Sequence, residues 1–184
     1  MPLGRIDITL MESDRVNDIN EDAEGRIWIA MMNGLASIEP GTGEVVWHDA
    51  VVPLESGGSK ILGLTRVFPD DQGRIWLASE HNGVMIYEPD SGRVRNLVHH
   101  PERPRSLPAM TAYDVLQTPD GKIWLTTSAG VCLWQEATGD FITYRAGGRD
   151  AQPSDNLMVR MQVDDEGLLW VGSAVGLYVF DPGR

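Results

Sequence analysis

A motif of the form Gly-x-x-Trp occurs four times in the chain at nearly equal spacing. The tryptophans follow one another at intervals of 48, 48 and 46 residues, and an acidic turn precedes each motif. A further glycine comes six or seven residues after each tryptophan. The tryptophans are Trp28, Trp76, Trp124 and Trp170, and the later glycines are Gly34, Gly83, Gly130 and Gly176. Regular self-similarity of this kind is the signature of a repeat architecture.

Each repeat is expected to form four short strands. The first strand ends at the acidic turn, the second carries the tryptophan, the third follows the later glycine, and the fourth follows a turn rich in Pro and Gly. The expected first strands are 15–20, 62–68, 110–117 and 157–163, and the second are 26–31, 74–79, 122–127 and 168–173. The third are 34–39, 83–88, 130–135 and 176–181, and the fourth are 44–49, 93–98 and 140–145. No segment keeps a helical apolar period, so no helix is expected.

The strand that carries the tryptophan is apolar on both faces. In Ile27-Trp28-Ile29-Ala30-Met31, residues of either parity are hydrophobic, whereas a sheet with one wet face would alternate. Sheets covered on both faces arise when four-stranded blades stack around an axis. The sequence therefore predicts an all-β fold, a β-propeller of four-stranded antiparallel blades with four blades per chain. The four tryptophans are expected to be structural, buried between blades.

The chain is expected to be a single propeller domain, 1–184, in which the last blade lacks its own fourth strand. The repeats cover 11–49, 60–98, 109–145 and 156–184, and the strand at 4–10 matches 139–145 in phase. This N-terminal strand is expected to complete the last blade, which removes an exposed sheet edge. Within one chain this gives a four-bladed ring. Between two chains it gives an eight-bladed homodimer through strand exchange. A third interpretation is a piece of a longer array.

Four charged residues stand at one register, seven positions before the motif glycines. In chain order they are Asp18, Arg66, Asp114 and Arg160. If these residues face the channel, acid and base alternate around the axis. A closed ring of four or eight blades keeps this alternation, whereas a ring of seven blades would bring two like charges together. The alternative interpretation is chance, because two acids and two bases fall in alternating order often enough without any structural cause.

Composition excludes several classes of protein. A formal net charge of −12 argues against a general binder of nucleic acid or anionic membranes, which needs a basic face. No apolar run is long enough to insert in a membrane, and the first twenty residues lack the apolar region of a signal peptide. Cys132 is the only cysteine, so no internal disulfide is expected, and it is expected to pack as a small hydrophobe.

The string at 17–30, followed by Asn33-Gly34-Leu35, resembles the two-component-regulator propeller repeat, and so does the copy at 164–182. The resemblance covers nearly the whole chain. It implies the extracytoplasmic, or periplasmic, sensor part of hybrid histidine kinases and diguanylate-cyclase receptors, which binds ligands such as glycan fragments. The chain departs from that family in having four repeats and no kinase or other output domain. The family's functional residues lie outside the repeat motif, so none carries over.

Ligand sites in propellers usually lie in the loops at one end of the channel. The candidates at this rim are Asn33, His81, Asn82, His99, Arg103 and Arg149. No metal site or cofactor is expected, because adjacent His99 and His100 point to opposite faces of a strand and no cysteine partner is present.

Three functions remain open on the sequence. The first is a non-catalytic sensor module that binds a small molecule, a glycan or a protein. The second is an enzyme of the lyase or hydrolase type, with His81 and His99 as its candidates. The third is a minimal or engineered scaffold whose only activity is self-assembly.

Overall fold

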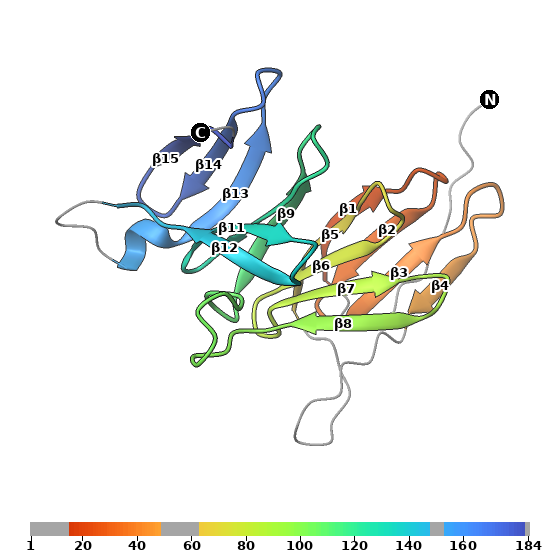
Figure 1. Ribbon diagram of the computed structural model, residues 1–184. Coiled ribbons are helices and arrows are strands. Elements are labelled where there is room, and N and C mark those ends of the chain that lie inside the picture. The colour runs from red at the N-terminus through yellow and green to blue at the C-terminus, as the bar shows by residue number, and fades with distance from the viewer. Residues whose placement is uncertain (1–14, 49–62, 148–152, 183–184) are drawn as a thin grey trace.

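The chain folds into four antiparallel sheets that follow one another in sequence order. A computed structural model describes residues 15–48, 63–147 and 153–182. Fifteen strands and one turn of 3-10 helix (Pro153–Asn156) make up this part of the chain. Figure 1 shows the sheets side by side, with the first and the last at opposite ends of the row. The prediction of an all-β propeller with four blades is confirmed, and the short 3-10 turn is the one departure from a helix-free fold. The strand expected at 4–10 lies outside the described residues.

Within each sheet every strand pairs with the next one along the chain. The first sheet consists of β1 (Val16–Glu21), β2 (Ile27–Met31), β3 (Gly34–Ile38) and β4 (Val45–His48). The second consists of β5 (Leu64–Pro69), β6 (Ile75–Ser79), β7 (Val84–Glu88) and β8 (Arg93–Leu97). The third consists of β9 (Ala112–Gln117), β10 (Ile123–Thr127), β11 (Gly130–Gln135) and β12 (Asp140–Tyr144). The fourth consists of β13 (Met158–Val163), β14 (Leu169–Ser173) and β15 (Leu177–Phe180). The residues that the structure describes form no helix that is long and apolar enough to cross a membrane.

In the first, second and fourth repeats, the acidic residue of the turn both closes the first hairpin and holds the indole. Asp70 Oδ1 accepts hydrogen bonds from the backbone N–H groups of Gln72 and Arg74, each at 2.9 Å. Asp70 Oδ2 accepts one from Trp76 Nε1 at 2.8 Å. Asp22 and Asp164 do the same for the first and fourth tryptophans. One carboxylate therefore fixes the turn and the orientation of the side chain that fills the core.

The third repeat has a threonine in place of this acid. Thr118 Oγ1 bonds to Asp120 Oδ1 and to the carbonyl of Lys122, so it stays within the turn. The Trp124 Nε1 group is buried and has no hydrogen-bond partner in the described part of the chain. A buried donor without a partner costs stability, so the third blade is held less firmly at this point than the others.

The core lies between the sheets. Trp28, Trp76 and Trp124 are fully buried or nearly so, and each packs against the sheet that follows its own. Trp28, for example, meets Leu64 and Leu77 of the second sheet. Trp170 differs, because no described sheet follows the fourth, and 40% of its surface is exposed. Cys132 is buried, and this burial raises the pKa of its thiol to about 12.

Candidate functional site

Each innermost strand carries one extra residue relative to the strand it pairs with. The ladders β1–β2, β5–β6, β9–β10 and β13–β14 all skip one position on the inner strand. The skipped residues are Asn17, Thr65, Tyr113 and Val159. A bulge of this kind interrupts the regular alternation of side chains and re-aims the extra residue.

All four bulge residues line one cavity of about 220 Å³, which we call the axial pocket. Met32 and Glu80, which directly follow β2 and β6, contribute to its wall, as do two arginines. Its lining consists of Arg15, Asn17, Met32, Thr65, Glu80, Tyr113, Val159 and Arg160. The pocket therefore draws on all four sheets at the end of the axis where the inner strands begin.

The bulge residues play two different roles in the axial pocket. Asn17 Nδ2 donates to the carbonyl of Leu64 at 2.6 Å, and Thr65 Oγ1 donates to the carbonyl of Ala112 at 2.9 Å. These two side chains tie β1 to β5 and β5 to β9. Tyr113 adds an aromatic ring and a hydroxyl group, while Arg15 and Arg160 add positive charge to the wall.

The four predicted channel residues form a row of alternating charge, which we call the axial charge row. Arg66 Nη1 lies 3.0 Å from Asp18 Oδ1, and Arg66 Nε lies 2.8 Å from Asp114 Oδ1. The second contact is an ion pair only, since Arg66 Nε makes no hydrogen bond with any residue that the structure describes. Arg160 Nη1 lies 3.9 Å from the same Asp114 oxygen. The alternation in sequence is thus an alternation in space within the described residues.

The acids of the row also hold the backbone of the following sheet. Asp18 Oδ2 accepts from the Val67 N–H, and Asp114 Oδ2 accepts from the Met161 N–H, both at 3.0 Å. Arginine has no acceptor, so the junction between the second and third sheets lacks this contact. Burial raises the pKa of Asp114, while the hydrogen bond from Met161 and the charge of Arg66 oppose the shift.

The rim candidates do not gather at the axial pocket. Arg103 lines a separate cavity of about 510 Å³ between the β8–β9 connection and β12. His99 supports that connection, because its Nδ1 lies 2.8 Å from the carbonyl of Leu107. The side chain of His81 is exposed, 3.9 Å from Glu80, and Asn82 bonds to Ser79 in the β6–β7 turn. Asn33 lies in the β2–β3 turn, and Arg149 lies outside the described residues.

The sequence analysis named one lining residue of the axial pocket, Arg160, and missed Arg15, Met32, Glu80 and the bulge residues. Each bulge residue stands one position before a member of the axial charge row, but nothing in the sequence marks it as extra. As for metals, the described ranges bring together no group of three His, Cys, Asp or Glu side chains able to hold an ion.

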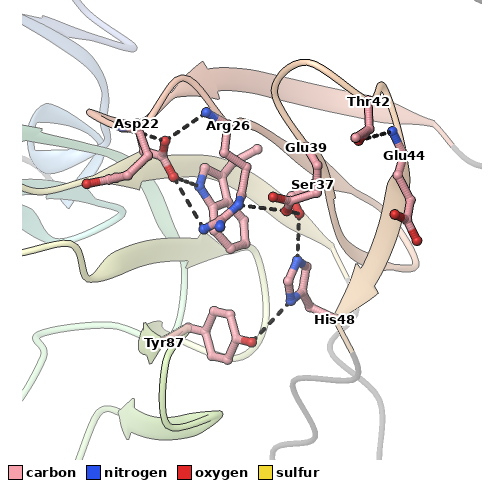
Figure 2. Close-up of polar contacts among 10 residues, drawn as sticks. Asp22, Arg26, Ser37, Glu39, Thr42, Glu44, His48 and Tyr87 are labelled. Atoms are coloured by element: carbon pink, nitrogen blue, oxygen red, sulfur yellow. Dashed lines mark hydrogen bonds and ion pairs between the residues drawn. The ribbon is translucent and has the colours of Figure 1, made fainter.

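A half-buried histidine between the first and second sheets also escaped the sequence analysis. The ring of His48 stacks 4.7 Å from that of Trp28. Its Nε2 lies 2.9 Å from Ser37 Oγ, and its Nδ1 lies 3.1 Å from Tyr87 Oη (Figure 2). Burial lowers the pKa of His48 from 6.5, and the nearby charge of Arg26 lowers it further.

This lowered pKa predicts that the protein loses stability under mild acid. The folded state binds a proton at His48 less readily than the unfolded state does, so the contribution of His48 is complete above pH 6.5 and declines as the pH falls toward the folded pKa. We expect the melting temperature to fall between about pH 7.5 and pH 5.5. The fall should be smaller in His48→Gln, which keeps polar atoms near Ser37 and Tyr87. His81→Gln, at an exposed site, is the matched control. Equal slopes in the wild type and His48→Gln would contradict the assignment.

The comparisons with known proteins agree with this architecture. Residues 11–33 match the family model described as two component regulator propeller, which confirms the resemblance seen in the sequence. The extracellular domain of a protein assigned as a one component system from B. thetaiotaomicron is similar, with a TM-score of 0.69 and 17% identity over 89% of this chain and 21% of that one. No curated protein matches the chain.

Two other solved structures share the fold. Virginiamycin B lyase from Staphylococcus aureus aligns with a TM-score of 0.63 and 14% identity over 92% of this chain and 56% of that one. The computationally designed Ika4 protein aligns with a TM-score of 0.60 and 14% identity over 92% of both chains. The chain spans 21% to 28% of the length of the extracellular sensor domains that it matches. At these identities the likeness shows the propeller fold, which sensors and lyases share.

Proposed function

We propose that the chain is a non-catalytic binding module of the sensor type, which works on the extracytoplasmic side of a membrane and takes its ligand in the axial pocket. One observation carries this proposal: a bulge in each of four inner strands sends its extra residue to the same cavity. Bulges disrupt pairing and are concentrated next to functional sites, so a bulge repeated in every blade at one register favours a selected role.

The wall of the axial pocket suits a small anionic ligand that carries hydroxyl groups. Arg15 and Arg160 offer charge-assisted hydrogen bonds to a carboxylate. Glu80 accepts hydrogen bonds from hydroxyl groups, and the ring of Tyr113 offers a flat apolar face. The axial pocket has a volume of about 220 Å³, which is smaller than most pockets that bind a drug-sized molecule. We therefore infer a ligand of one or two sugar units with a carboxylate, such as a uronic acid.

Thermal-shift and calorimetric titrations with galacturonate, glucuronate and their disaccharides test the proposal, beside the neutral sugars galactose and glucose. A ligand that binds the folded state raises the melting temperature. We expect at least one acidic sugar to do so, and the affinity to fall at least tenfold in Arg15→Gln and in Tyr113→Ala.

Arg103→Gln is the matched control, because Arg103 lines the cavity beside β12 instead of the axial pocket. Its affinity should equal that of the wild type. If no acidic sugar shifts the melting temperature, or if Arg103→Gln loses binding while Tyr113→Ala keeps it, the proposed site is wrong. The first outcome favours the scaffold interpretation.

A further inference from the structure

The cavity that Arg103 lines lies between the outermost strands of the second and third sheets, and we call it the outer pocket. It has a volume of about 510 Å³, and its wall comes from the end of β8, the β8–β9 connection, the β11–β12 turn and the start of β12. Pockets that bind small molecules mostly have volumes of about 300–1,000 Å³. The outer pocket falls within this range, whereas the axial pocket is smaller.

The β8–β9 connection is held in one shape by hydrogen bonds of its own. Ser106 Oγ accepts from the His100 N–H at 2.9 Å and donates to the His100 carbonyl at 3.0 Å. The Arg103 N–H donates to the His100 carbonyl at 2.9 Å. The connection is also fixed to β12, because the Phe141 N–H donates to the Arg105 carbonyl at 2.8 Å. A wall that is ordered before a ligand arrives loses little conformational entropy on binding.

The base of the outer pocket is apolar. Leu107 is fully buried and Phe141 nearly so, which places them at the inner end of the cavity that they line. Leu97 and Val98 are half-buried and line it as well. Apolar walls favour the body of an organic molecule over a bare ion, because the contact removes apolar surface from water.

Two guanidinium groups stand at the mouth of the outer pocket. Arg103 and Arg105 line the cavity, and both are exposed. Arg105 Nε lies 3.0 Å from Asp140 Oδ2, while Thr138 Oγ1 donates to Asp140 Oδ1 at 2.7 Å. Both oxygens of this carboxylate therefore have a partner. Within the described residues, the Arg103 guanidinium and the Nη groups of Arg105 make no ion pair, so they can contact a ligand.

The stretch 93–105 is basic in a chain that is acidic overall. It contains four arginines and one acid, Glu102, whereas the whole chain has a net charge of −12. Arg95 lies beside the outer pocket, because its guanidinium stacks over Trp134 and comes within 3.5 Å of the position that a Cβ of Gly139 would take. A positive region on an acidic protein attracts anions. Planar guanidinium groups suit carboxylates, which they bind through two parallel hydrogen bonds.

We propose that the outer pocket binds an organic carboxylate with an apolar body, such as a small aromatic acid. The carboxylate lies between Arg103 and Arg105 at the mouth, and the body of the ligand fills the base beside Val98. This site is separate from the axial pocket, with which it shares no lining residue. The chain therefore has a second binding site, between two blades and away from the axis.

Calorimetric titration with three aromatic acids and their amides tests this site. The acids are benzoate, phenylacetate and naphthalene-1-acetate, and each amide has nearly the same shape but no charge. We expect at least one acid to bind, and its amide to bind about tenfold more weakly or worse, because the amide makes no charge-assisted pair with an arginine. Acetate, which has no apolar body, should bind at least tenfold more weakly too. If none of the three acids binds, or if acid and amide bind equally, the proposal is wrong.

Four variants locate the bound acid. Arg103→Gln and Arg105→Gln should each lower the affinity about tenfold, and Val98→Phe should abolish binding because its ring fills the base. Arg145→Gln is the matched control, since Arg145 is exposed and follows β12 directly but does not line the outer pocket. Its affinity should equal that of the wild type. An equal loss in Arg145→Gln and Arg103→Gln, or unchanged binding in the three pocket variants, would overturn the assignment. Circular dichroism of each variant confirms that it is folded.

Discussion

Replacing Trp76 by alanine should lower the free energy of unfolding by about 3–5 kcal/mol. The indole is fully buried between the second and third sheets, where its ring meets that of Trp134 at 5.6 Å. The change removes this packing and leaves Asp70 with one hydrogen bond fewer. Urea denaturation followed by circular dichroism measures the loss.

Trp170→Ala is the matched control, since Trp170 has the same motif and the same bond to its turn carboxylate. Its indole is partly exposed, so less than half of the loss is expected. If Trp76→Ala and Trp170→Ala lower the free energy of unfolding equally, burial between sheets is not the source of the stabilisation by Trp76.

Gly83→Ala should cost about 2–5 kcal/mol, as the sum of backbone strain and a steric conflict. The φ angle of Gly83 is +72°, in the left-handed region that side chains with a Cβ adopt at a cost. A Cβ at this position would meet the carbonyl oxygen of Leu97 on β8 at 2.4 Å. Because both groups belong to the backbone of one sheet, β7 and β8 would have to separate.

Gly73→Ala separates the two contributions. Gly73 has a φ of +73°, and nothing lies within 4 Å of the position its Cβ would take. Its cost should be the backbone strain alone, about 1–2 kcal/mol. If thermal or urea unfolding gives the same loss for both variants, the close approach of Leu97 is relieved without cost and this explanation is wrong.

The features predicted from the sequence are those that a residue type encodes directly. The acid before each motif and the glycine after the tryptophan specify turns, and the apolar strand of either parity specifies a sheet covered on both faces. These signals place the strands within a few residues of their observed bounds. The register of Asp18, Arg66, Asp114 and Arg160 follows from their fixed distance to the motif glycines, so the sequence alone predicts the alternating row.

The axial pocket could not be predicted because no residue type marks a bulge. Asn17, Thr65, Tyr113 and Val159 share nothing but their position, and only the pairing with the next strand shows that they are extra. His48 was missed for a related reason. Its partner Tyr87 lies 39 residues away in another sheet, so the pair exists only once two blades are packed.

The carboxylates that clamp the next sheet occur in the first and third blades only, and this has a consequence for how such arrays change in length. Such an array is expected to gain or lose blades in pairs, in which one blade carries the carboxylate that binds the next sheet and the other carries the arginine that neutralises it. Duplicating a single blade, or deleting an inner one, would set two acids or two bases next to each other in the axial charge row. Gain or loss of such a pair keeps an acid beside a base at every position of the row. Descendants of this chain should therefore differ from it by an even number of blades.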